Sequence, residues 1–429
     1  MPLRRISLAS YRCFDGTTDM ELRPMTIVLG RNNSGKSALV RAPMVVEKGI
    51  RTNSPEPIDL DAIDDEIVES FTDLIYGHRP HGSITVGLDI EDSKGEPLLL
   101  AATIQHIDEY DRQVVSSLSI DHHGERCTAK WNQGNPDESD DFRYDLRLGD
   151  SSDKDVPLHF HGLLPDTNTG KLELTQIDRF LFEKGYDVQH EYPEIRYFGP
   201  FRDRPVRRFG SPTGTPRSLG SSGENAGKIL AADHARRGGQ LLSEVNNVLS
   251  KDLPGWSVDL NEQGNQYSIV LQSKDDPALN VNLADAGTGV AQVLPVFVQR
   301  ALDVLTPPKT PVLEIMEQPE LHLHPAAHGG LADLYLTAAL RGNIQFLIET
   351  HSETLLLRIR RRIAEGLIEP EQVALYFVEH ERGRATSRRI NIGHDGGLDY
   401  WPDGVFSEDY EEARALTIAQ LNSGGQDAR

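Results

Sequence analysis

The sequence predicts an α/β fold with a mostly parallel core sheet, an antiparallel β-rich lobe and a helical insertion. In the last third of the chain, short apolar strands alternate with helical segments, which is typical of a parallel sheet with crossover helices. Between residues 83 and 104, apolar and polar residues alternate on both sides of a turn-like segment, which predicts an antiparallel hairpin. Near the N-terminus, the apolar strand 25–29 runs directly into a glycine-containing loop and then a helix.

The bounds of these elements follow from hydrophobic periodicity and from turn residues. In the last third we expect helices at residues 288–305, 326–341 and 352–365, and strands at 312–316, 344–348 and 373–378. Earlier in the chain we expect strands near 114–120 and 158–163, helical segments over 224–251, and a surface loop over 133–155. Pro43 lies inside the helix that begins at Lys36, and we expect it to kink or shorten that helix.

The bulk properties favour a cytoplasmic protein. The chain has 429 residues, enough for one large domain with insertions or for two or three modules. Its formal net charge of −22 argues against a constitutive nucleic-acid binder, because phosphate binding depends on Lys and Arg, although a local basic groove is not excluded. Cys13 and Cys127 are expected to be reduced. The N-terminal residues do not resemble a signal peptide, and no apolar stretch is long enough to span a membrane.

The loop after strand 25–29 has the pattern of a phosphate-binding P-loop. Residues 30–37 read GRNNSGKS and fit G-x-x-x-x-G-K-[ST]. Its glycines let successive backbone N–H groups point at phosphate oxygens, and the following helix contributes its N-terminal dipole. Lys36 should reach the β- and γ-phosphates, and the Ser37 hydroxyl should bind Mg²⁺. The loop residues expected to bind the nucleotide are Asn32, Asn33, Ser34, Gly35, Lys36 and Ser37.

A second acid is expected at the tip of a neighbouring parallel strand. The strand 312–316 leads into Glu317, which we predict to bind Mg²⁺ together with Ser37. Glu314 is unusual in a strand that is otherwise apolar, so it should lie near an edge or face a polar partner.

Histidines follow both of these strands. His351 comes directly after strand 344–348, where it could hydrogen-bond the γ-phosphate. His322, His324 and His328 could form a metal cluster, but Pro325 interrupts regular geometry and no cysteine is near. We expect these three histidines to shape the loop and a contact between subunits.

Four segments, in this order, resemble the motifs of ABC-like ATPases of the RecF, SMC and OLD group. They are residues 30–37, 285–292 (DAGTGVAQ), 317–325 (EQPELHLHP) and 349–352 (ETHS). The likeness is greatest to bacterial "AAA domain" proteins, several of which belong to anti-phage defence operons. It spans roughly residues 1–365, with 51–190 covered only as a variable insertion. Residues 376–406 look like the small tail module of an uncharacterised branch.

The resemblance implies an ABC-type P-loop NTPase fold, Mg²⁺ and ATP as cofactors, and a site completed by dimerisation. In such ATPases the glycine-rich signature caps the γ-phosphate held by the partner subunit, which implies this role for Gly287, Thr288 and Gly289. A homo-oligomer is therefore expected, either one dimeric unit or an assembly of dimers. The chain after residue 365 is too short for the nuclease domain of OLD proteins, so an effector such as a nuclease is expected as a separate protein.

Gln318 departs from the family pattern. ABC-type ATPases usually carry a glutamate directly after the second acid as the general base, and this chain has Gln318 there. A glutamine can orient a water but cannot take its proton. Hydrolysis could therefore be slow, or use a substitute base such as Glu320, or be replaced by ATP sensing; we predict weak turnover, with Gln318, Glu320 and His351 as the catalytic candidates.

Five segments are expected on this basis. Residues 1–50 form the N-terminal part of the ATPase core with the P-loop, 51–200 a β-rich insertion or N-lobe, 201–285 a helical and strand segment leading to the signature, 286–370 the C-terminal part of the core, and 371–429 a small C-terminal module. The leading hypothesis is a dimerising ATPase that gates a partner effector, plausibly in anti-phage defence. The alternatives are a RecF-like factor that clamps DNA and a non-catalytic scaffold that holds its nucleotide.

Overall fold

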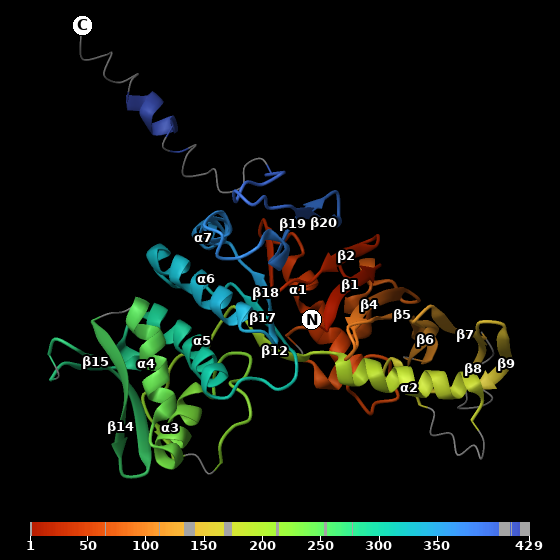
Figure 1. Cartoon of the computed structure of the whole chain (residues 1–429), viewed down its shortest axis with the longest axis horizontal. Helices are drawn as coiled ribbons and strands as arrows, with labels where there is room; N and C mark the ends of the chain where they lie inside the picture. The colour runs from red at the N-terminus through yellow and green to blue at the C-terminus, as the bar shows by residue number, and fades with distance from the viewer. Residues whose placement is uncertain are drawn as a thin grey trace, which may run out of the picture.

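Figure 1 presents the computed structural model of the chain as a central core flanked by a β-rich lobe and a helical part. The structure describes residues 2–64, 66–110, 112–132, 142–166, 174–211, 214–252, 255–276, 278–402, 412 and 414–420. No helix within these ranges is both long and apolar enough to cross a membrane.

The core is a six-stranded sheet in which the P-loop strand lies in the interior. Its order is β12-β17-β18-β3-β19-β20, and every neighbouring pair is parallel except β19 and β20. The strands are β12 (Glu194–Phe198), β17 (Val312–Glu317), β18 (Ile344–Glu349), β3 (Met25–Gly30), β19 (Val373–Glu381) and β20 (Arg384–Ile390). The strands β3, β17 and β18 are buried along their whole length, which explains why most of their residues are apolar.

Helices cover both faces of this sheet and form two apolar cores. The residues of α1 (Lys36–Ile50) belong to one core, and those of α5 (Thr288–Leu305), α6 (Pro325–Leu340) and α7 (Glu353–Ala364) belong to the other. Alternate side chains of one strand enter the two cores: Val28 of β3 faces the α1 side, while Ile27 and Leu29 face the other. The parallel strands therefore end at one edge of a sheet that is buried on both faces.

The β-rich lobe is a separate antiparallel sheet of eight strands, with order β2-β1-β4-β5-β6-β7-β8-β9. Its strands are β1 (Leu3–Ala9), β2 (Thr18–Glu21), β4 (Ser83–Glu91), β5 (Pro97–Ile107), β6 (Arg112–His122), β7 (Glu125–Trp131), β8 (Arg143–Leu148) and β9 (Ser151–Pro157). The predicted hairpin is confirmed as β4 and β5, and alternate residues of β4 are buried. Helix α2 (Gln176–Glu191) packs along this sheet (Figure 1), beside the short hairpin β10 (His159–His161) and β11 (Leu164–Asp166).

The helical part lies on the other side of the core in Figure 1. It contains the helices α3 (Ala226–Arg237) and α4 (Gln240–Asp252), and the strands β13 (Phe209–Gly210), β14 (Trp256–Gln263), β15 (Gln266–Ser273) and β16 (Asn280–Asn282). The predicted α/β class is therefore confirmed, with its antiparallel lobe, helical segment and mostly parallel core sheet. The sheets combine strands from different expected segments. Strands β1 and β2, from residues 1–50, belong to the sheet of the lobe, whereas β12, from residues 51–200, and β19 and β20, from residues 371–429, belong to the core sheet.

Two local predictions were wrong. Pro43 does not shorten helix α1, which continues to Ile50, because most of its residues from Leu39 onward are buried and this packing outweighs the one hydrogen bond that proline removes. Residues 143–157 form β8 and β9 rather than a loop, because the alternating side chains of Tyr144, Leu146 and Leu148 are buried in the lobe. The rest of that predicted loop, residues 133–141, lies outside the described residues.

Candidate functional site

The P-loop is shaped by close backbone approaches at two glycines. At Gly30, a Cβ atom would lie 2.3 Å from the Val378 carbonyl oxygen. Gly35 adopts φ +102°, in the region that favours glycine, and a Cβ there would lie 2.5 Å from Cys13 Sγ. Helix α1 begins at the next residue, Lys36. Glycine is thus required where the loop leaves β3 and where it enters the helix.

The loop opens onto a cavity of about 720 Å³, within the ordinary size range of small-molecule sites. It brings the P-loop together with side chains that follow β17 and β18, because the carboxyl ends of parallel strands meet at one edge of the sheet. Predicted residues that line it are Asn32, Asn33, Ser34, Gly35, Lys36, Ser37, Gln318 and His351. Residues that were not predicted include Arg12, Glu69, His78, Glu349 and His380.

The Lys36 ammonium is buried and held inside the loop. Its side chain is 4% exposed, and Nζ donates a hydrogen bond of 2.7 Å to the Arg31 carbonyl oxygen. Glu349 Oε1 lies 3.9 Å from Nζ. Burial lowers the pKa of Lys36, and the negative charge of Glu349 opposes that effect. Among the described residues, the cation therefore has one short hydrogen bond, to Arg31, that phosphate oxygens could replace.

The two acids at the strand ends have different partners. Glu317 accepts hydrogen bonds from Arg41 Nε at 2.5 Å and Nη2 at 2.8 Å, and from the Tyr197 hydroxyl at 2.8 Å. The Ser37 hydroxyl donates to Glu349 Oε2 at 2.7 Å, although the sequence pairs Ser37 with Glu317. Glu317 and Glu349 are directly opposite each other in β17 and β18. Glu349 could have been predicted as a site residue, because it ends an apolar strand of the expected parallel sheet, as Glu317 does.

Gln318 and Glu320 hold the loop after β17 against the end of β18. Gln318 has φ +43°, an uncommon conformation for a non-glycine residue, and its N–H donates to the Glu349 carbonyl oxygen at 2.8 Å. The buried Glu320 accepts hydrogen bonds of 2.7 Å from the Thr350 hydroxyl and from the His351 N–H. Glu320 is not among the residues that line the cavity. Burial, followed by the nearby Lys36, lowers the pKa of His351, which favours its neutral form.

The signature residues lie away from this cavity in their own chain. Gly287 is the N-cap of α5 and Thr288 its first residue, and both are exposed. At Gly289, a Cβ atom would lie 2.8 Å from the His322 carbonyl oxygen, so the helix start packs closely on the loop after β17. None of the three lines the cavity around Lys36.

Arg202 connects α5 with the loop after β17. This role was not predicted, because Arg202 lies in a basic segment of the sequence that is typical of an exposed loop. Its backbone N–H and carbonyl exchange hydrogen bonds with the Gln292 side chain at 3.2 and 3.0 Å. Its Nη1 donates to the Gln318 carbonyl oxygen at 3.4 Å. The side chain is buried, so Arg202 contacts both the helix α5 and the loop that contains Gln318.

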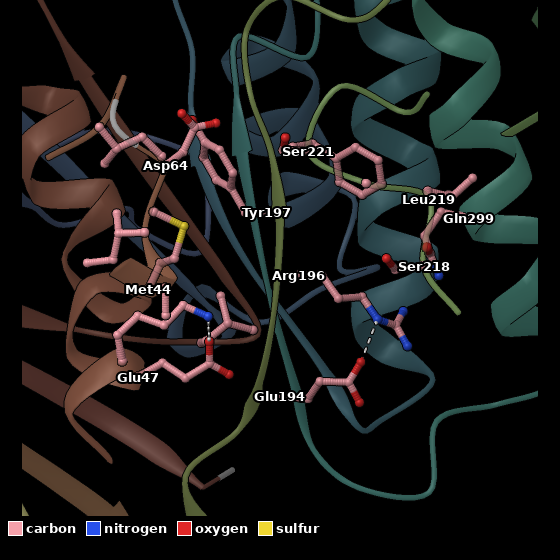
Figure 2. A pocket seen from close by; sticks show the side chains of 17 residues that line it. Met44, Glu47, Asp64, Glu194, Arg196, Tyr197, Ser218, Leu219, Ser221 and Gln299 are labelled. Carbon is pink, nitrogen blue, oxygen red and sulfur yellow. Dashed lines mark hydrogen bonds and ion pairs between the residues drawn. The ribbon is translucent and has the colours of Figure 1, made fainter. Parts of the chain in front are cut away.

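A second cavity of about 300 Å³ lies between α1, β12 and residues 218–221, as Figure 2 shows. Tyr197 lines this cavity, and its hydroxyl donates a hydrogen bond to Glu317. The remaining labelled side chains include uncharged residues such as Met44 and Leu219, and the ion pair of Arg196 with Glu194.

Histidine clusters elsewhere have partners within the protein. The group of Asp92, His122 and His123 has the spacing of metal ligands, but Asp92 accepts from the N–H groups of Lys94 and Glu96 and from His122 Nε2. Those backbone hydrogen bonds, that of Glu96 foremost, lower the pKa of Asp92 to about 2. The contacts join the ends of two hairpins.

The three histidines after β17 do not form a metal-ligand group within the described ranges. His324 caps α6 by accepting from the Ala326 N–H, and His328 Nδ1 lies 2.7 Å from the Ser352 hydroxyl. Their contacts shape the loop and the start of α6, which agrees with the structural part of the prediction.

The donor set at the P-loop fits a magnesium ion. The Ser37 hydroxyl and the Glu349 carboxylate line the cavity, and Mg²⁺ prefers such oxygen ligands. Glu317, the predicted metal ligand, is not among the lining residues, although it is the register partner of Glu349. Ser37 and an acid at these strand ends, with the loop N–H groups, would hold Mg²⁺ and a nucleotide phosphate.

Comparison with known proteins gives one family match and several similar structures. A family described as "Protein of unknown function (DUF3696)" matches residues 368–416, which include the expected tail module at 376–406. No curated protein matches the chain. An Smc head bound to the C-winged helix domain of ScpA is 13% identical, with a TM-score of 0.45 over 91% of this chain and 98% of that chain. The SMC head domain from Thermotoga maritima is 12% identical, with a TM-score of 0.43 over 91% of this chain and 100% of that one.

Proposed function

We propose that the chain is an ATPase that binds Mg·ATP through residues 30–37. The observation that carries this proposal is the arrangement of Lys36 and Ser37 around a cavity of about 720 Å³, next to acids at the ends of β17 and β18. Bound Mg²⁺ would neutralise phosphate charge during transfer. The loop N–H groups and Lys36 bind the phosphates, and His351, which is favoured in its neutral form, hydrogen-bonds the γ-phosphate.

We further propose that ATP completes the site between two subunits. The exposed residues Gly287 and Thr288 lie at the N-terminus of an 18-residue helix and away from the cavity of their own chain. A helix N-terminus attracts anions, so this surface is suited to a γ-phosphate held by a second copy. Arg202 would then transmit the contact from α5 to the Gln318 loop of the same chain.

Changing Thr288 to glutamate is expected to abolish ATP-dependent dimerisation while leaving nucleotide binding to the monomer intact. Thr288 is exposed, and an acid in the first turn of a helix is favourable, so folding is retained. A negative charge facing the partner's γ-phosphate opposes association. Molecular mass is measured by light scattering with Mg²⁺ and a non-hydrolysable ATP analogue.

Gln240→Glu provides a matched control, because Gln240 is also exposed and also begins a helix. This variant should dimerise as the wild type does. Dimerisation of T288E at wild-type nucleotide concentrations would contradict a role for this surface across the interface.

Turnover is expected to be slow, below about 10 s⁻¹, the middle of the ordinary enzyme range. Gln318 lines the cavity where a general base would act, and its amide cannot accept the proton of the attacking water. The buried Glu320 is held by Thr350 and His351, which favours positioning of the His351 loop over proton transfer. Steady-state phosphate release measures the rate; a value well above this limit would exclude a slow switch.

The proposed output is the gating of a separate protein effector, such as a nuclease in anti-phage defence. The net charge of −22 favours a protein partner over constitutive DNA binding. DNA binding that requires ATP and weakens with salt would instead support a DNA clamp, and nucleotide that never exchanges would support a scaffold. The gene beside this one distinguishes a defence system from a repair system.

A further inference from the structure

Two buried acids compete for the metal role at the P-loop. Glu317 is 2% exposed and Glu349 is 3% exposed, and they are register partners in adjacent parallel strands. A carboxylate that binds Mg²⁺ needs an oxygen free to face the ion and a place next to the Ser37 hydroxyl. The contacts of each acid decide which of them meets both conditions.

The negative charge of Glu317 is balanced by Arg41 within the protein. Arg41 donates to both of its oxygens, and the Tyr197 hydroxyl donates to Oε1 as well. The Arg41 guanidinium also lies over the Tyr197 ring, with its carbon 5.9 Å from the ring centroid. This bidentate pair is a strong charge-assisted contact that an incoming cation would have to break.

Glu349 contacts the two P-loop side chains that serve the nucleotide. Its Oε2 accepts the Ser37 hydroxyl proton at 2.7 Å, and its Oε1 lies 3.9 Å from Lys36 Nζ. A hydroxyl has one proton and two lone pairs, so donation to Glu349 leaves the Ser37 oxygen able to coordinate a metal. No guanidinium is bonded to Glu349 among the described contacts.

We propose that Glu349 supplies the carboxylate that holds Mg²⁺ together with Ser37, and that Glu317, Arg41 and Tyr197 form a positioning group for the end of β17. This inference rests on the proposed binding of Mg·ATP. Glu349 is the counter-ion of Lys36 in this structure, and with Mg·ATP bound its charge would face the metal while the phosphates would contact Lys36.

The test compares Glu349→Gln with Glu317→Gln in the full chain, using Mn²⁺ as a spectroscopic substitute for Mg²⁺. Binding of Mn²⁺ to the protein–ADP complex is measured by electron paramagnetic resonance. E349Q is expected to lower the Mn²⁺ affinity at least about tenfold, because it removes a charged ligand, whereas E317Q changes it by less than about threefold. In EDTA, E349Q should bind ADP as tightly as the wild type or more tightly, since a negative charge near the phosphates is gone.

Two other outcomes of this test would contradict the inference or the proposed function. Loss of Mn²⁺ binding in E317Q with normal binding in E349Q would overturn this inference and leave ATP binding intact. Failure of the wild-type chain to bind nucleotide at all would overturn the proposed function as well. If E349Q does not fold, as judged by its thermal unfolding, the pair E349D and E317D replaces it. E349D should then lower Mn²⁺ affinity more than E317D, and the reverse order would overturn the inference.

Discussion

Replacing Lys36 with alanine is expected to lower ATP affinity at least about 100-fold, which corresponds to about 3 kcal/mol. Lys36 is the buried cation of the P-loop, and its Nζ donates a short hydrogen bond to the Arg31 carbonyl oxygen. The variant loses the charge that binds the β- and γ-phosphates and also leaves Glu349 without its counter-ion.

Isothermal titration with ATP in Mg²⁺ measures this change, and Lys48→Ala is the matched control. Lys48 lies on the same helix, α1, with its side chain 30% exposed and paired with the adjacent Glu47. K48A should bind ATP like the wild type. Equal ATP affinities of K36A and the wild type would defeat the assignment of residues 30–37 as the nucleotide site.

Replacing Arg300 with methionine is expected to lower the free energy of unfolding by about 3–5 kcal/mol, because it leaves a buried acid unpaired. Glu314 is fully buried in β17, and Arg300, 3% exposed, pairs with it from α5. Arg300 also pairs with Asp303 at 2.9 Å, which in turn bonds Arg196 at 2.7 Å. The acid that was unusual in the sequence thus faces a polar partner, as predicted.

The stability loss of R300M should grow as the pH rises. Burial raises the pKa of Glu314, with Arg300 opposing that effect, so removal of Arg300 favours the neutral acid still more. Between the ordinary pKa of the unfolded state and its raised folded-state pKa, Glu314 is protonated when folded and releases its proton on unfolding, so the free energy of unfolding falls as the pH rises through that range. Chemical denaturation at pH 5 and pH 8 measures the difference.

Changing both partners, in R300M with E314L, should recover most of the lost stability, since apolar residues of similar volume tolerate burial. Asp303 keeps Arg196 as its partner in this variant. A loss below about 1 kcal/mol in R300M alone, the range of an exposed ion pair, would contradict the importance of this buried network.

The parts of the fold that could be predicted were those encoded by consecutive residues. Helix α5 spans Thr288–Leu305 as expected, and the strand–loop–helix unit around Lys36 follows from local periodicity and glycine placement. Local patterns were less reliable where packing opposed them. Pro43 is accommodated by the buried face of α1, and residues 143–157 form strands because Tyr144 and Leu146 fit the core of the lobe.

The contacts of site residues that come from different strands and loops could not be predicted from the sequence. Arg202 belongs to a basic, glycine- and proline-rich segment, yet it is buried between α5 and the Gln318 loop. Glu317 and Glu349 both end apolar strands, and only the pairing of β17 with β18 places them side by side. Which acid Ser37 meets is then decided by Arg41 and Tyr197, which lie far from Glu317 in sequence.

The sequence by itself determined the α/β class, the strand–loop–helix unit around Lys36 and the strand ends that lie beside it, because each depends on the pattern of adjacent residues. Only the tertiary structure decided how the charges are shared at that edge of the sheet. Strand register and side-chain packing bring together residues that are hundreds of positions apart. As a result, Arg41 hydrogen-bonds Glu317 and Ser37 hydrogen-bonds Glu349.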